Sequence, residues 1–212
     1  MRFGRRREAD QAPDPDEPVE RADEPGIADL PPVGPFDETQ VDLDDHEGID
    51  LGSLVVTPGH DMELQLQVDE STGDVGAALL VGQDGALELR AFAASRGGGA
   101  WDDLRPQIAA EVTRMGGTAS EQDGSYGPEL LCLVPIQTPE GQGATQTSRI
   151  TGHEGSTWLL RATLIGPPAA DGELAGPWDE AIRRTVVRRG REARAPGSAL
   201  PLRLPPDARR ME

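Results

Sequence analysis

The chain has 212 residues, carries a formal net charge of −18, and takes every positive side-chain charge from arginine, with no lysine. So acidic a chain lacks the dense positive surface that non-specific binding to nucleic acid requires. A folded part of about 165 residues buries roughly 70% of its unfolded surface, so stability requires neither a metal nor a disulfide. The single cysteine, Cys132, excludes an intramolecular disulfide and a cysteine-cluster metal site.

The charge is distributed unevenly along the chain. Residues 1–50 carry 16 acidic side chains against five arginines, whereas residues 180–212 carry nine arginines against four acidic side chains. The basic C-terminal end is therefore the one region whose charge favours binding to an anionic partner.

The opening "MRFGRRREAD" is similar to the charged start of an export signal, but an acidic, proline-rich stretch follows it in place of an apolar one. We therefore expect a cytoplasmic protein. Residues 1–32 hold too few apolar side chains to offset the entropy of ordering, which predicts a disordered Pro/acid-rich arm. The whole chain is therefore predicted to consist of this arm, a single domain over 33–205, and a C-terminal tail over 206–212. No apolar run reaches the roughly 18–20 residues of a membrane helix, so no membrane contact is expected.

Beyond residue 50 the apolar residues alternate with a period of two, which is typical of strands. Strands are predicted over 51–56, 62–68, 77–82 and 87–93, separated by turns rich in Gly and Asp. A helix is predicted from Trp101 to Met115, with Gly116 ending it. Its apolar face comprises Trp101, Leu104, Ile108, Val112 and Met115.

The second half repeats this order. Strands are predicted over 129–137, 145–152 and 156–165, and a helix begins at Trp178. Ile182 and Val186 share the face of Trp178, and Gly190 is the predicted end of that helix. A last alternating stretch, "ALPLRL", places Leu200, Leu202 and Leu204 on one side of an edge strand.

The predicted fold class is α+β, as a single domain with a mostly antiparallel sheet. Two meander-plus-helix units build it, and both helices pack on one face of the sheet.

Two arginines occupy equivalent places in the repeated "LRA" triplets, Arg90 and Arg161. One hypothesis is that they bind an anionic ligand together at a pseudo-twofold axis. The favoured alternative pairs each with acids at the nearby helix start, either Asp102 or Asp103 and either Asp179 or Glu180. Trp101 and Trp178 are interpreted as anchors between helix and sheet.

The residues predict no catalytic, cofactor-binding or metal site. His46, His60 and His153 each stand beside turn residues without the spacing of metal ligands. Cys132, within "LLCLV", is predicted to be a buried packing residue. His153, Glu154 and Ser156 lie close in sequence, but neighbours in a hairpin turn diverge, which disfavours a catalytic triad.

Seven stretches together resemble an actinobacterial family of proteins catalogued as domain of unknown function 3710. They are "GPFDE", "IDLGSL", "LELRAFAASR", "EVTRMGGTASEQDG", "GPELL", "WLLRATLIGPPA" and "LPLRLP". The resemblance runs from about Gly34 to Pro205. It implies a single domain in a cytoplasmic bacterial setting, and it carries over no activity and no functional residues.

Three classes of function remain, and the residues favour the first. It is a non-enzymatic protein-interaction or regulatory module with an unidentified protein partner. The second is a nucleic-acid-associated protein that uses the arginine-rich C-terminal helix, and the third is an enzyme without a recognisable motif. The candidate interaction surface is Arg183, Arg184, Arg188 and Arg191. We further hypothesise that the acidic residues 8–50 compete with an external anion for this surface.

Overall fold

A computed structural model describes residues 34–68, 74–138, 141–171 and 176–205. Residues 33–212 form one compact unit, and the account below concerns its described residues. The predicted arm and C-terminal tail lie outside the described residues. None of the helices in the described ranges has the length and apolar composition to cross a membrane.

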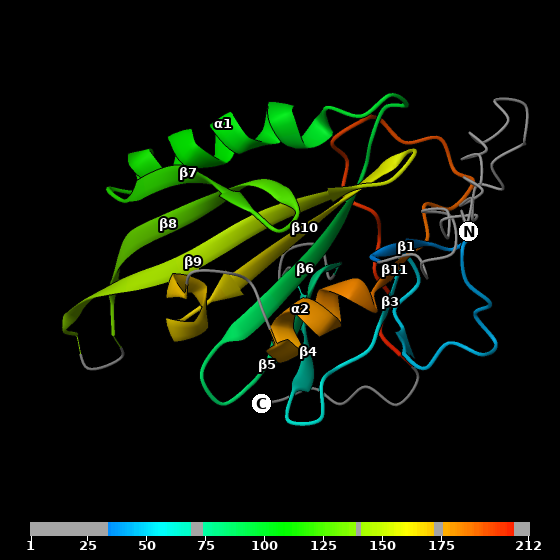
Figure 1. The fold of residues 1–212 in the computed structure, drawn as a ribbon, viewed down its shortest axis with the longest axis horizontal. Coiled ribbons are helices and arrows are strands. Elements are labelled where there is room, and N and C mark those ends of the chain that lie inside the picture. Colours follow the sequence, from blue (N-terminus) through cyan, green and yellow to red (C-terminus); the bar gives the residue numbers. More distant parts are fainter. Residues whose placement is uncertain (1–33, 69–73, 139–140, 172–175, 206–212) are drawn as a thin grey trace, which may run out of the picture. The chain divides into compact units, whose positions relative to one another are not determined.

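Seven antiparallel strands form the larger sheet, in the order β4-β5-β6-β10-β9-β8-β7 (Figure 1). Their bounds are β4 Glu63–Val68, β5 Val75–Val81, β6 Ala86–Ala93, β7 Thr118–Gly124, β8 Gly127–Gln137, β9 Gly143–Glu154 and β10 Trp158–Ile165. Consecutive strands pair within the runs β4–β6 and β7–β10. The two runs meet where β6 pairs with β10 along the full length of both strands.

Helix α1 (Ala100–Arg114) covers one face of this sheet over β7, β8 and β9 (Figure 1). Trp101 and Val112 pack there against Leu130, Ile150 and Leu159. A Cβ atom on Gly152 would clash with the Trp101 indole, so the ring rests directly on the backbone of β9. The predicted apolar face is confirmed except at Met115, which is 51% exposed beyond the end of the helix.

The opposite face carries the larger core. Leu160, Ala162 and Leu164 pack there with residues of α2 (Gly176–Arg183), including Trp178 and Ile182. The short helix η2 (Pro167–Ala170) buries Ala169 in the same core. A four-stranded sheet, β1-β11-β3-β2, contributes Leu54, Val56 and Val187. Its strands are β1 Phe36–Asp37, β2 Ile49–Asp50, β3 Leu54–Val56 and β11 Val186–Val187.

The two helices therefore lie on opposite faces of the larger sheet, and the prediction that both pack on one face is wrong. Successive side chains of a strand point to opposite faces. In β10, Leu159 packs in the α1 cluster whereas Leu160 packs in the α2 cluster, and both are buried. Apolar side chains on both faces require a cover on both, so one helix goes to each.

The second helix is also shorter than predicted. It ends at Arg183, and Val186 and Val187 form β11, which pairs in parallel with β1 and antiparallel with β3. The run Thr185–Val187 is β-branched, and such residues fit a strand better than a helix. The sequence from Arg188 onwards therefore leaves the small sheet as a loop rather than as a helix.

The other differences concern segments with little apolar patterning. Strand β7 was not predicted, because its sequence "TASEQDG" is polar and it lies at the edge of the sheet. In the final stretch Leu200 and Leu202 are buried, but Leu204, which was predicted on the same side, is 57% exposed. That stretch makes isolated bridges rather than a continuous strand.

Each helix packs one tryptophan against the sheet, Trp101 in α1 and Trp178 in α2. We expect Trp101→Ala and Trp178→Ala each to lower the free energy of unfolding by about 3–5 kcal/mol, because both leave cavities in the core. Denaturant unfolding of the two variants measures this. A loss below about 1 kcal/mol at either position would contradict the anchor role.

Candidate functional site

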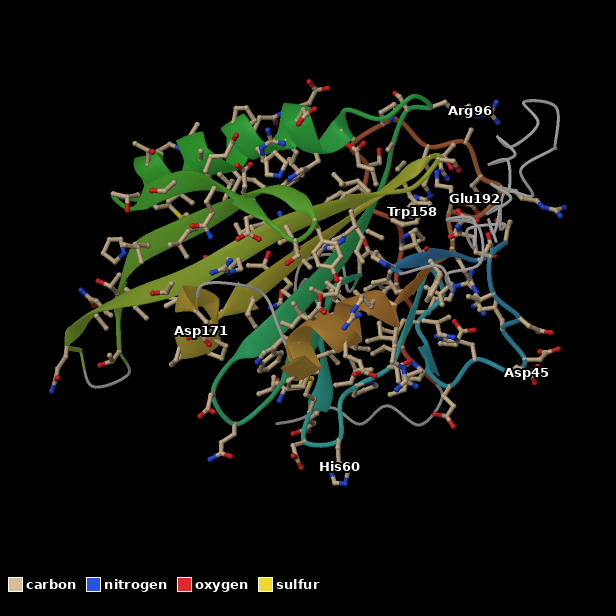
Figure 2. All side chains as sticks on the ribbon, viewed as in Figure 1. Asp45, His60, Arg96, Trp158, Asp171 and Glu192 are labelled. Carbon is tan, nitrogen blue, oxygen red and sulfur yellow. The ribbon has the colours of Figure 1, made fainter. Side chains whose placement is uncertain are left out.

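An arginine-lined groove of about 720 Å³ lies beside the small sheet. Four segments meet there: Glu38 after β1, the β2–β3 turn at Asp50–Ser53, the loop after β11, and the C-terminal segment from Pro201. Glu192, on the loop after β11, is labelled in Figure 2. The charged lining residues are Arg188, Arg189, Arg191, Arg194, Arg203, Glu38, Asp50 and Glu192.

Backbone pairing brings these segments together. The Arg188 N–H donates to the Ser53 carbonyl oxygen at 2.9 Å, which extends the pairing of β11 with β3 by one step. The Arg203 N–H donates to the Leu51 carbonyl oxygen at 2.8 Å. Because Leu51 and Leu202 are buried, the C-terminal segment is held against the β2–β3 turn, and Arg203 faces the loop that carries Arg188.

The groove has more positive charge than its own acids neutralise. Arg188 pairs with Asp50 at 2.6 Å and Arg194 pairs with Glu192 at 2.7 Å. Among the described residues, the side chains of Arg191 and Arg203 make no hydrogen bond and no ion pair. Burial raises the pKa of Asp50, but hydrogen bonds from Arg188 and the Gly52 N–H outweigh it and lower that pKa. Asp50 is therefore ionised and fixes Arg188 in place.

The four arginines of the predicted interaction surface do not lie together: two are at the end of α2 and two are in the groove. Arg183 pairs with Asp179 at 2.8 Å, and Arg184 lies 3.5 Å from Glu47 and 3.9 Å from Glu180. Arg188 and Arg191 line the groove and do not lie on a helix. Sequence reasoning missed Arg189, Arg194 and Arg203 as members of the site, although the density of arginine in this region was the available signal.

Arg90 and Arg161 face each other directly, one on β6 and one on β10. Both contact the carboxylate of Glu88, Arg161 at 2.8 Å and Arg90 at 3.1 Å. The predicted pairing with acids at the helix starts is wrong, because Asp102 pairs with Arg105 and Asp179 with Arg183. The cause is register: Glu88 lies two residues before Arg90 on the same face of the sheet.

A buried polar cluster on the α2 side of the sheet was not predicted. The Tyr126 ring packs edge-on against His153, with 4.4 Å between ring centroids, and the Tyr126 hydroxyl donates to Asp179 of α2. Nε2 of His153 lies 2.9 Å from the Thr151 hydroxyl. Burial lowers the pKa of His153 to about 4 and raises that of Tyr126, so the cluster contains a neutral imidazole and a neutral phenol. It joins β9 to α2.

A second buried pair fastens η2 to the sheet. Arg149 and Glu129 form an ion pair, and each side chain is 2% exposed. Arg149 also donates to the carbonyl oxygens of Ala169 and Asp171, while Gln122 donates to Glu129 at 2.8 Å. A buried pair with its remaining polar atoms satisfied is a structural element, and removing one partner leaves an uncompensated charge.

The residues of "GHEGS" diverge as predicted and form no triad. Glu154 accepts hydrogen bonds from the N–H groups of Gly99 and Trp101, at 2.9 and 2.5 Å. It thereby caps the N-terminus of α1, which has no side-chain cap of its own. Cys132 is fully buried, and burial raises the pKa of its thiol, which confirms the packing role. The described residues contain no group of His, Cys, Asp or Glu side chains placed to hold a metal ion.

The buried neutral His153 makes stability depend on pH. Its pKa is about 4 in the folded chain against 6.5 unfolded, so the unfolded chain takes up a proton more readily. The stabilisation is present above pH 6.5 and is lost as the pH falls towards 4. Between pH 7 and 5 we expect His153 to account for a loss of about 2 kcal/mol.

Urea unfolding at both pH values measures this loss. His153→Gln should remove most of it, whereas His60→Gln, at a fully exposed position, should leave it unchanged. An undiminished loss in His153→Gln would show that other groups cause it.

The comparisons with known proteins concern the family. A search of curated proteins gave no match. A crystal structure from Bacteroides thetaiotaomicron VPI-5482 is similar with a TM-score of 0.38 and 16% sequence identity, over 65% of this chain and 46% of that chain. A family model described as "Protein of unknown function (DUF3710)" matches residues 34–211, and the chain belongs to this family.

Proposed function

We propose that this protein is a non-enzymatic interaction module of the cytoplasm whose arginine-lined groove binds an acidic segment of a partner protein. The observation that carries the proposal is the surplus of positive charge in the groove. Five arginines meet three acids there. Among the described residues, Arg191 and Arg203 form no hydrogen bond and no ion pair, although the charge of Arg203 helps to lower the pKa of Asp50. Such a groove attracts carboxylates at short range, although the chain as a whole is acidic, because salt screens charges beyond about 8 Å.

The lining favours a polypeptide over a nucleic acid. Among the described lining residues there is no Phe, Trp or Tyr on which a base could stack. Glu38, Asp50 and Glu192 interrupt the positive surface, and each would repel a continuous phosphate backbone. An acidic peptide can instead place its carboxylates at the arginines and other side chains at these positions.

The rim of the groove supports the same partner. Pro201, Leu204 and Pro205 line it, and Leu204 is one of the exposed large apolar residues of the chain. An apolar side chain next to the acids of a partner would bury Leu204, which adds a hydrophobic contribution to the charge contacts. Recognition of an acidic motif by an arginine cluster is a known mode of peptide binding.

The test is fluorescence anisotropy of the full chain with a labelled peptide that alternates Glu–Glu pairs with Leu. Arg191→Glu and Arg203→Glu should each weaken binding by roughly tenfold, because each reverses a positive charge of the groove that forms no ion pair. Arg114→Glu makes the same change of charge at the far end of α1, outside the groove, and should bind as the wild type does.

Two results would contradict the proposal. The first is equal binding by all four proteins. The second is tighter binding of a single-stranded oligonucleotide than of the peptide at the same salt concentration, which would favour the nucleic-acid function instead. Each variant's thermal midpoint, compared with that of the wild type, shows whether it is folded.

A further inference from the structure

A second group of charged residues, separate from the groove, lies on the face of the larger sheet that α1 packs against, in the half that α1 does not cover. Because α1 covers β7–β9, the face of β6 and β10 on that side is left partly exposed. Glu88, Arg90, Phe92 and Arg161 lie there, each of them partly exposed. Gln67 of β4 joins this group by accepting a hydrogen bond from Arg90 at 3.2 Å.

The charges in this group do not balance. Two guanidinium groups share the single carboxylate of Glu88, which leaves one positive charge. Arg161 also lies over the Phe92 ring at 5.7 Å, a contact that holds its guanidinium group without neutralising it. No other acidic side chain among the described residues forms an ion pair with Arg90 or Arg161.

The hydrogen bonds do not balance either. Nε of Arg90 and Nε of Arg161 are shielded from solvent, and neither has a hydrogen-bond acceptor among the described residues. The Arg90 Nε lies 3.1 Å from Glu88, but its angle allows an ion contact without a hydrogen bond. A buried donor without an acceptor is rare in folded proteins and costs free energy, so the described residues do not fully satisfy either guanidinium group.

We propose that Arg90 and Arg161 together bind one carboxylate group supplied from outside the domain. A carboxylate carries the single negative charge that this group lacks, and its two oxygens match the donor geometry of guanidinium. Because Nε is shielded in both, the carboxylate would meet the exposed remainder of each side chain, which is 35% exposed for Arg90 and 22% exposed for Arg161. The carboxylate can come from a small organic acid or from an acidic side chain of a polypeptide.

This geometry also predicts how the site responds to substitution. Glu88 competes with the ligand for the same two guanidinium groups. Glu88→Gln should therefore bind a carboxylate more tightly than the wild type, by roughly tenfold for the loss of one nearby negative charge. A purely structural ion-pair network predicts no gain of binding in that variant.

The experiment follows the Nε–Hε signals of the arginines of the full chain by nuclear magnetic resonance. Sodium acetate serves as the free carboxylate, a neutral-ended peptide with one Glu as the polypeptide source, and sodium chloride as the ionic-strength control. We expect saturable shifts of the Arg90 and Arg161 signals with acetate, with the peptide, or with both, and none with chloride. Shifts with one probe alone identify the source.

Internal controls separate this proposal from the groove. Nε of Arg105 already donates to Glu121 at 3.0 Å, so its signal should stay fixed. The Arg189 signal reports on the groove, and its shift alone would support the proposed function while overturning this site. Arg161→Gln should abolish the Arg90 shift, with its thermal midpoint showing whether the variant is folded.

Two outcomes would overturn the proposal. One is that neither carboxylate shifts the Arg90 and Arg161 signals in the wild type. The other is that Glu88→Gln, folded as judged by its thermal midpoint, binds acetate no more tightly than the wild type does.

Discussion

The pairing of β6 with β10 is the constraint on which the rest of the structure depends. In the described sheet it joins the strands before α1 to those after it, through eight opposed residue pairs from Ala86–Ile165 to Ala93–Trp158. The register decides which side chains reach each face. It sends Leu89, Ala91, Leu160 and Ala162 to the α2 core and brings Arg90 and Arg161 together on the other face.

Both faces of the larger sheet carry buried apolar side chains, and each helix covers those of one face. Helix α1 shields the β7–β9 end of one face, and α2 with the small sheet shields the other. Trp158, labelled in Figure 2, ties the two sheets together by donating from its indole to Asp37 of β1 at 2.7 Å. The small sheet in turn holds the loop after β11 beside Asp50, which is where the arginines of the groove gather.

The sequence predicted the elements that are determined by the spacing of nearby apolar residues. Alternation located the long strands, and helical spacing with Gly116 located α1. Two-residue strands such as Ile49–Asp50 have no period to detect, and they form only because distant segments pair with them. The repeated triplet placed Arg90 and Arg161 at equivalent positions, but it did not predict that β6 pairs with β10 so that the two arginines face each other. Likewise, the meeting of Arg203 with Arg188, and the capping of α1 by Glu154, depend on contacts between segments far apart in sequence.

The most direct test of this account is native-state hydrogen exchange of the amides of β6 and β10. If their pairing joins the two runs of strands, the hydrogen-bonded amides of residues 86–93 and 158–165 exchange only through global unfolding. Their free energies of opening then equal the free energy of unfolding from denaturant titration. Opening of the β6–β10 amides at a clearly lower free energy, with β7–β9 still protected, would contradict the central role of this pairing.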